Sequence, residues 1–257
     1  MLIGLLIAYL FLGGGHETFL LNPNMVKNVN TYVKDKDRKE KIDKIIKSVG
    51  KSQDEFEKQT RKTTDKNLVT LNMDPSATVT SFQTEYNKFY AGLKTLQESY
   101  IDSELVIKSL IKPNEWDSIM KKVLVTPSKD KAKKQITKKN QDLHNRLVNA
   151  CKKAIANTVD QQKANQYVQE YTAKGDTLAS AFLDLNYKYL KSIRPYSATR
   201  SDFEQARIQM IQLRRNYTDY LVTMRFNLIA ITPKDKWKDL AKELNNSFSY
   251  FGAGMPN

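Results

Sequence analysis

The sequence contains few of the residues that build catalytic or metal sites. One cysteine, Cys151, and two histidines, His16 and His144, occur in 257 residues, which leaves no internal disulfide and no His/Cys metal cluster. Phosphate-loop, dinucleotide-binding and nucleophile-elbow strings are also missing. Cys151 is therefore expected to be a small buried apolar residue. The sequence favours a non-enzymatic protein that uses no cofactor and no metal.

Glycine and proline are also scarce, at 9 and 7 residues, which excludes a low-complexity linker. Strand-like alternation is not sustained anywhere, whereas apolar residues recur at spacings of three and four. This period predicts long helices that include residues 42–56, 82–105, 136–155 and 203–228. The predicted fold is all-α, a bundle of long antiparallel helices behind an N-terminal transmembrane helix.

Helix start signals support this pattern. Asp74 is expected to cap a helix that begins at Pro75, and Ser201 and Glu204 are expected to form a capping box. Residues 194–201 are expected to break the chain between two helices.

The N-terminal residues form the one long apolar stretch. Residues 1–15 carry no charged side chain, and a helix over residues 1–21 would nearly cross a bilayer. Gly4 and Ala8 are four residues apart, a spacing that lets membrane helices pack closely, although a chance pair explains it equally well. Glu17 is expected at the headgroup level, with a proton-handling role as the alternative. The segment lacks a basic start and an A-x-A site, so we expect an uncleaved anchor rather than a signal peptide.

The net charge of +14 invites an acidic partner. Residues 121–153 hold eleven basic and two acidic side chains, and the predicted partner is an acidic protein or an anionic lipid surface. Nucleic acid is disfavoured because aromatic residues are not interleaved there and lysine predominates over arginine. The alternative is that these lysines only coat a solvent-exposed helix face and bind no partner. The predicted basic surface comprises Lys121, Lys122, Lys129, Lys131, Lys133, Lys134, Lys138 and Lys139.

A corner motif occurs twice, as "IKPNEW" at 111–116 and "ITPKDKW" at 231–237. In the second copy Thr232 is expected to cap a helix, Pro233 to open it, Ile231 to pack on its first turn and Trp237 to face the core. In the first copy the same roles fall to Lys112, Pro113, Ile111 and Trp116, with Glu115 completing the cap.

The two copies suggest an internal repeat. At an offset of 120 residues Leu93 matches Leu213, Tyr100 matches Tyr220 and Ile101 matches Leu221, although helices of similar composition can also align by chance. The predicted organisation is an anchor over residues 1–21, a helical unit over 22–125 and a second unit over 126–257, packed as one body.

"ITPKD" resembles the Leu-Thr-x-x-Gln motif of the small periplasmic helical proteins of the Spy and CpxP type, with Ile231, Thr232 and Asp235 at the matching positions. "IKPNE" is similar only at Ile111 and Glu115. The resemblance covers about ten residues. It implies an extracytoplasmic helical body that cradles client proteins or senses envelope stress.

The leading hypothesis is thus a single-pass inner-membrane protein with a periplasmic helical body. It would act by protein contact, as an accessory or scaffold subunit of an envelope complex, with a membrane-protein partner for the N-terminal helix. The alternatives are a tethered chaperone of the Spy type, or a nucleic-acid-binding protein that uses residues 121–153.

Overall fold

Helices make up every regular element of the computed structural model, which describes residues 23–123 and 129–248. The all-α prediction is confirmed for these residues. The elements are α2 (Pro23–Tyr32), α3 (Lys36–Phe56), the π-helical turn η1 (Glu57–Arg61), α4 (Lys62–Met73), α5 (Val79–Leu110), α6 (Pro113–Val123), α7 (Lys129–Ala154), α8 (Thr158–Ile193), α9 (Arg200–Ile229) and α10 (Lys234–Phe248).

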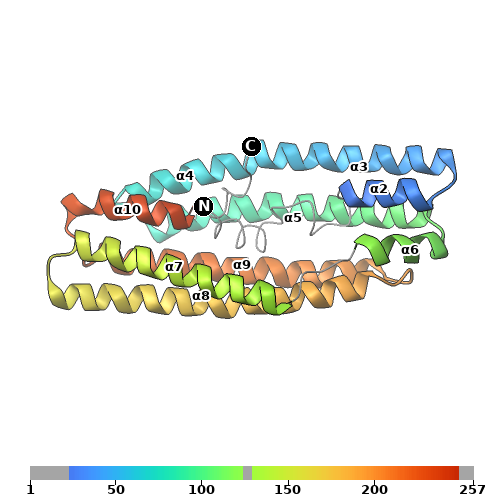
Figure 1. Cartoon of the computed structure of the whole chain (residues 1–257). Helices are drawn as coiled ribbons and strands as arrows, with labels where there is room; N and C mark the ends of the chain where they lie inside the picture. Colours follow the sequence, from blue (N-terminus) through green and yellow to red (C-terminus); the bar gives the residue numbers. More distant parts are fainter. Residues whose placement is uncertain (1–22, 124–128, 249–257) are drawn as a thin grey trace.

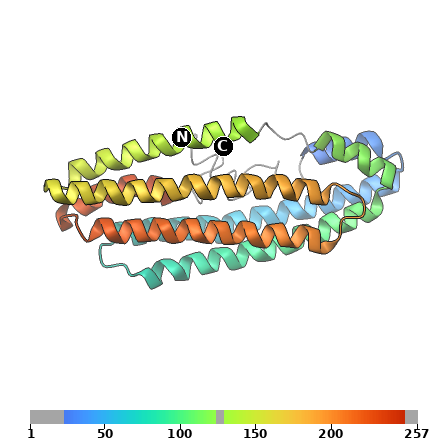
Figure 2. The ribbon, with the colours of Figure 1, turned by 90° about the horizontal axis from the view of Figure 1, so that it is seen from below.

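The long helices run along a common axis in an elongated bundle (Figure 1). The rod formed by α3, η1 and α4 packs on α5, α5 packs on α9, and α7, α8 and α9 lie side by side (Figure 2). The short helices close the ends: α2 packs on α6 at one end, and α10 packs on α7 and α4 at the other. Each long helix buries one stripe of apolar side chains, as the three-and-four spacing predicts.

Two predicted helix starts are wrong. Asp74 and Pro75 lie in the connection before α5, where the Asp74 carboxylate accepts hydrogen bonds from the amide (2.8 Å) and hydroxyl (2.7 Å) of Ser76. Such an Asx turn competes with capping, and Thr78 precedes α5 instead. In α9 the extended residue Thr199 sets an earlier start. Its amide and hydroxyl donate to Asp202, so the capping box is formed by this pair and not by Ser201 and Glu204.

The two parts of the described chain, residues 23–123 and 129–248, have the same connections in the same order. Residues 33–35 join α2 to α3, and residues 155–157 join α7 to α8. Val33 and Ile155 are buried at the start of these connections. Asp35 and Asn157 end them, and each side chain accepts a hydrogen bond from an amide of the helix that follows.

The next connection repeats in the same way. Ser-Ala-Thr occupies residues 76–78 before α5 and residues 197–199 before α9. Ala77 and Ala198 are both buried, and Thr78 and Thr199 precede the two helices.

The register of this similarity differs from the predicted 120 residues. From Thr78 to Met120 an offset of 121 places most buried side chains on buried side chains, whereas at 120 Leu93 and Tyr100 would fall on the half-buried Leu213 and Tyr220. Buried pairs at 121 include Phe82 and Phe203, Phe89 and Met210, Leu96 and Tyr217, Tyr100 and Leu221, Glu104 and Arg225, Ile107 and Leu228, and Trp116 and Trp237.

The π-helical turn accounts for one further residue. Before it the matching offset is 122, as in Ile42 with Ala164, and after it the offset is 121, as in Leu68 with Tyr189. A π-helical turn holds one more residue than an α-helical turn. The extra residue of the first rod is therefore absorbed at η1, and the buried stripe keeps its direction on both sides. At this level α5 comes close, since a Cβ on Gly92 would lie 2.9 Å from Thr60 Cγ2.

The ends of two helices are capped across the bundle. The Trp116 indole donates to the Arg194 carbonyl at the end of α8 (2.9 Å), and the Trp237 indole donates to the Asn72 carbonyl at the end of α4 (3.0 Å). Two buried cations donate to further carbonyls near the same helix ends. Lys108 donates to Ala198 O, and Arg225 donates to Asp74 O (2.6 Å) and Leu71 O (3.2 Å). Each part of the chain thus supplies the donors that the other part needs.

We expect Trp116→Phe and Trp237→Phe each to lower the free energy of unfolding by about 1–3 kcal/mol, because each change leaves a helix-end carbonyl without its donor. Urea unfolding of the full chain measures this. Ile208→Ala, at a side chain of α9 that is 67% exposed, serves as the control and should change stability by less than about 0.5 kcal/mol. Equal midpoints for the tryptophan variants and the control would contradict the capping role.

Deletion of Gln59, an exposed residue of η1, should convert the π-helical turn to α-helix and leave a cooperative helical fold, with a loss below about 2 kcal/mol. Deletion of Ala181 in α8 should be far more damaging, because it rotates the rest of that helix by about 100° relative to its neighbours. Circular dichroism during thermal unfolding compares the two deletions. Equal damage from both would show that η1 does not absorb an extra residue.

Candidate interaction surface

Three predicted site residues lie outside the described residues. Gly4, Ala8 and Glu17 fall in the predicted anchor, residues 1–21, of which the structure describes nothing. Within residues 23–123 and 129–248, no helix combines the length and the apolar character that a membrane span requires. The predicted anchor thus stays a prediction.

The described part of the basic surface lies on α6 and the first half of α7. Lys121 and Lys122 are exposed in the last turn of α6, and Lys133, Lys134 and Lys138 are exposed on α7. Lys129, Lys131 and Lys139 belong to α7, but their side chains are outside the description. Lys121 pairs with Asp117 at 2.7 Å, an exposed i,i+4 ion pair of small energetic weight.

The first corner motif is built as the sequence predicts in most respects. Pro113 is the first residue of α6, and Glu115 accepts a hydrogen bond from the Lys112 amide at 2.9 Å. Ile111 and Trp116 are both buried.

The second corner differs from the first by one residue. The helix α10 begins at Lys234, one residue after Pro233, so the two prolines hold different positions. Trp237 is buried and Ile231 is half-buried. Thr232 does not cap α10: its buried hydroxyl donates to Leu228 O in the preceding helix at 2.7 Å.

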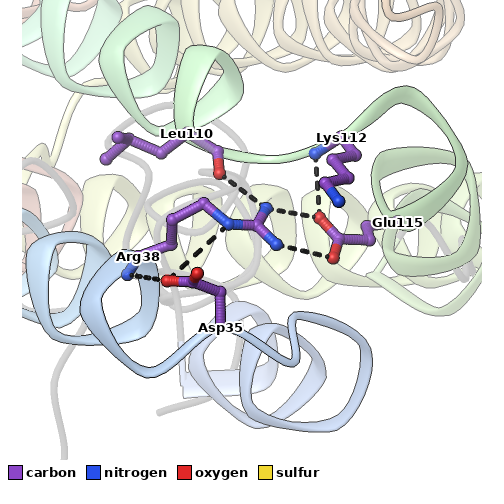
Figure 3. Close-up of polar contacts among 5 residues, drawn as sticks. All are labelled: Asp35, Arg38, Leu110, Lys112 and Glu115. Carbon is purple, nitrogen blue, oxygen red and sulfur yellow. Dashed lines mark hydrogen bonds and ion pairs between the residues drawn. The ribbon is translucent and has the colours of Figure 1, made fainter.

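An ion pair closes the first corner (Figure 3). The Arg38 guanidinium donates to both carboxylate oxygens of Glu115 at 2.7 and 3.0 Å, and also to the Leu110 carbonyl at 3.0 Å. Asp35, the cap of α3, lies 3.9 Å from Arg38 Nε. Three helix ends are thereby joined: the start of α3, the end of α5 and the start of α6.

The ion pair changes the acidity of Glu115. The hydrogen bond from Arg38, aided by the Lys112 amide, lowers the pKa of the Glu115 carboxyl to about 2. The side chain is 11% exposed, so the pair is only partly screened by water.

A groove lies at the opposite end of the bundle, between α7 and α10. Its volume is about 540 Å³. The apolar residues in its lining are Ala150, Ala154 and Leu240, and the charged residues are Arg146, Lys153, Lys236, Asp239 and Glu243.

The described residues contain no group of three or more His, Cys, Asp or Glu side chains placed to hold a metal ion. Cys151 is buried, as predicted, and burial raises the pKa of its thiol to about 12. The ring of His144 lies on the same helix, with Nδ1 3.3 Å from the Thr172 hydroxyl. Tyr171, Tyr189 and Tyr217 are buried in the core.

Sequence reasoning missed the charged groups inside the bundle. Arg207 is buried and donates to Glu104 (3.0 Å), to the Tyr189 hydroxyl (3.1 Å) and to Gln97 O (2.8 Å). Arg214 is 3% exposed, and no described group accepts from its Nε or Nη1. The spacing of Arg207 and Arg214 could have indicated their burial. They are seven residues apart within the apolar stripe of α9, so they face the same side of the helix as that stripe.

Comparisons of the chain with protein-family models, with curated proteins and with solved structures gave no match.

We expect Glu115→Gln to lower stability at pH 7 by about 1–2 kcal/mol, because it removes the charge from a partly buried hydrogen-bonded pair. Since the folded-state pKa of Glu115 is depressed to about 2, this stabilisation is present above the unfolded pKa and is lost as pH falls from about 4.5 towards 2. The difference between variant and parent should shrink over that window. Denaturant unfolding at a series of pH values measures it.

Glu98→Gln is the matched control, because Glu98 is an exposed carboxylate 3.7 Å from Lys94. A stability difference for Glu115→Gln that does not change with pH would contradict the role of the charge.

Proposed function

We propose that this chain is a non-enzymatic, membrane-anchored helical scaffold that binds the acidic surface of a membrane-protein partner. In this proposal residues 1–21 anchor the protein in the inner membrane and the helical body lies in the periplasm. The anchor packs on the partner through Gly4 and Ala8, and the body presents its basic surface.

The observation that carries the proposal is the exposure of the lysines on α6 and α7. Lys121, Lys122, Lys133, Lys134 and Lys138 all reach solvent. In contrast, the buried cations Lys108, Arg207 and Arg225 donate to acceptors inside the bundle, so they serve the fold. Exposed charges of one sign attract an acidic surface and speed its association.

We also infer that the helical body arose by duplication of a four-part unit. The support is the repeated order of connections, the match of buried positions at 121 residues and the matching helix contacts, α2 with α6 and α7 with α10. On this view the first unit spans residues 22–125 and the second spans 126–257.

Copurification from native membranes in mild detergent tests the scaffold. We expect the parent chain to copurify with a membrane protein at a fixed ratio. The triple variant Lys133→Glu, Lys134→Glu, Lys138→Glu should weaken this association by roughly tenfold or more, and added salt should weaken the parent in the same direction.

The matched control is Lys41→Glu, Lys44→Glu, Lys51→Glu, which makes the same change in net charge at exposed residues of α3. Recovery of the parent only as a free monomer would overturn the proposal. Equal losses for both triple variants would show that net charge, and not this surface, holds the partner. If the parent binds protein-free vesicles that contain anionic lipid, and no protein partner is recovered, the partner of the basic surface is lipid and not protein.

The predicted membrane anchor, residues 1–21, is tested separately. Leu6→Arg with Phe11→Arg places two charges in the apolar stretch and should release the protein from membranes washed with alkaline carbonate. Retention of that variant would contradict the anchor.

A further inference from the structure

The groove between α7 and α10 has a counterpart in the first part of the chain, where α2 packs on α6. The offset of 122 that relates α2 to α7 places Met25 on Leu147 and Val29 on Cys151, all four buried. By the same offset, Ala154 in the groove corresponds to Tyr32. Tyr32 is half-buried and packs against the core. The first part therefore places an aromatic ring where the second part has a methyl group.

Charge differs at the same place. Arg38 and Glu115, which close the first corner, correspond to Asp160 and Lys236 at offsets of 122 and 121. Asp160 does not repeat that ion pair, because its carboxylate lies 3.1 Å from Lys163 in its own helix. Lys236 is exposed and lines the groove. The second corner thus places Lys236 in the lining of the groove, 4.0 Å from Asp235 of its own helix, where the first corner has an ion pair between two helices.

The groove lining is basic overall. Arg146, Lys153 and Lys236 outnumber the two acidic residues, and one of these, Asp239, lies 3.2 Å from Lys242 on α10. The apolar lining consists of the half-buried Ala150 and of Ala154 and Leu240, which are buried. A volume of about 540 Å³ is within the range of sites that hold a small ligand or an anchoring side chain.

We propose that this groove binds a short segment of a partner protein, which inserts an aromatic side chain above Ala150 and Ala154 and places a carboxylate near Lys153 and Lys236. The aromatic ring takes the place that Tyr32 holds in the first part of the chain. Buried aromatic anchors are common centres of binding energy, and the lysines select an acidic neighbour. The inference rests on the proposed function only in that both concern partner binding, since the groove is separate from Lys133, Lys134 and Lys138.

A displayed library of random peptides, about twelve residues long, tests this on the full chain in detergent micelles. We expect the enriched peptides to share one aromatic residue with Asp or Glu within about one helical turn of it. Ala154→Tyr should weaken their binding by roughly tenfold or more, because the new ring fills the groove. Ala91→Tyr, which adds the same ring at an exposed position of α5, should leave binding unchanged.

Lys236→Glu gives a second variant at an exposed residue, where folding is not at risk. It should weaken the acidic peptides several-fold, and replacing the peptide's acidic residue by lysine should restore binding to this variant but not to the parent. A merely structural role for Lys236 would not produce that reversal.

The proposal is overturned if the enriched peptides bind Ala154→Tyr as well as the parent, or if they share no aromatic and acidic residues. It is also overturned if peptides bind only after Tyr250→Ser and Phe251→Ser, since the chain's own C-terminal residues would then be the occupant. Failure here is distinguishable from failure of the scaffold: Lys133→Glu, Lys134→Glu, Lys138→Glu should keep peptide binding, whereas Ala154→Tyr should keep the membrane partner.

Discussion

The carbonyls at the ends of long helices are the constraint on which this bundle depends. The last carbonyls of any helix have no partner within it, and burying them without a donor is costly. Here the donors for α4 and α8 come from the opposite part of the chain: Trp237 and Arg225 for α4 and its following turn, Trp116 and Lys108 for α8 and its following turn. Because these donors cross between the two parts, neither part has a complete set of its own.

The same exchange explains why Lys108 and Arg225 lie in the core. Burial lowers the pKa of both Arg214 and Arg225 to about 10, so each stays charged at neutral pH although its charged form is disfavoured. Arg225 offsets this with two carbonyls and three aromatic rings, the nearest centroid being that of Phe226 at 4.6 Å. Arg214 has the ring of Phe182 at 5.9 Å. Buried charges of this kind add little net stability compared with apolar packing.

Helical period could be read from the sequence, and fine register could not. The spacing of apolar residues was enough to place long helices around 82–105 and 203–228, since burial on one face imposes that spacing. The repeated Ile-x-Pro string then set an offset of 120, although burial follows 121, because proline fits both the first helical residue (Pro113) and the residue before it (Pro233). Trp116 and Trp237 mark the offset of 121 correctly, because each indole is held in place by a helix-end carbonyl. The ion pair of Arg38 with Glu115 depends on three helix ends meeting in space, which no local pattern encodes.

The comparison of the two corners separates what the fold needs from what it leaves open. Both corners keep a buried tryptophan, so that residue belongs to the scaffold. At the first corner Arg38 and Glu115 form a bidentate ion pair with each other, and Tyr32 packs against the core. These side chains thus find their partners within the protein. At the second corner Ala154 takes the position of Tyr32 and Lys236 takes the position of Glu115. The helices still pack there, and the Trp237 indole still donates to the Asn72 carbonyl. The fold therefore does not require the groove to be filled, whereas both parts of the chain take part in the capping exchange.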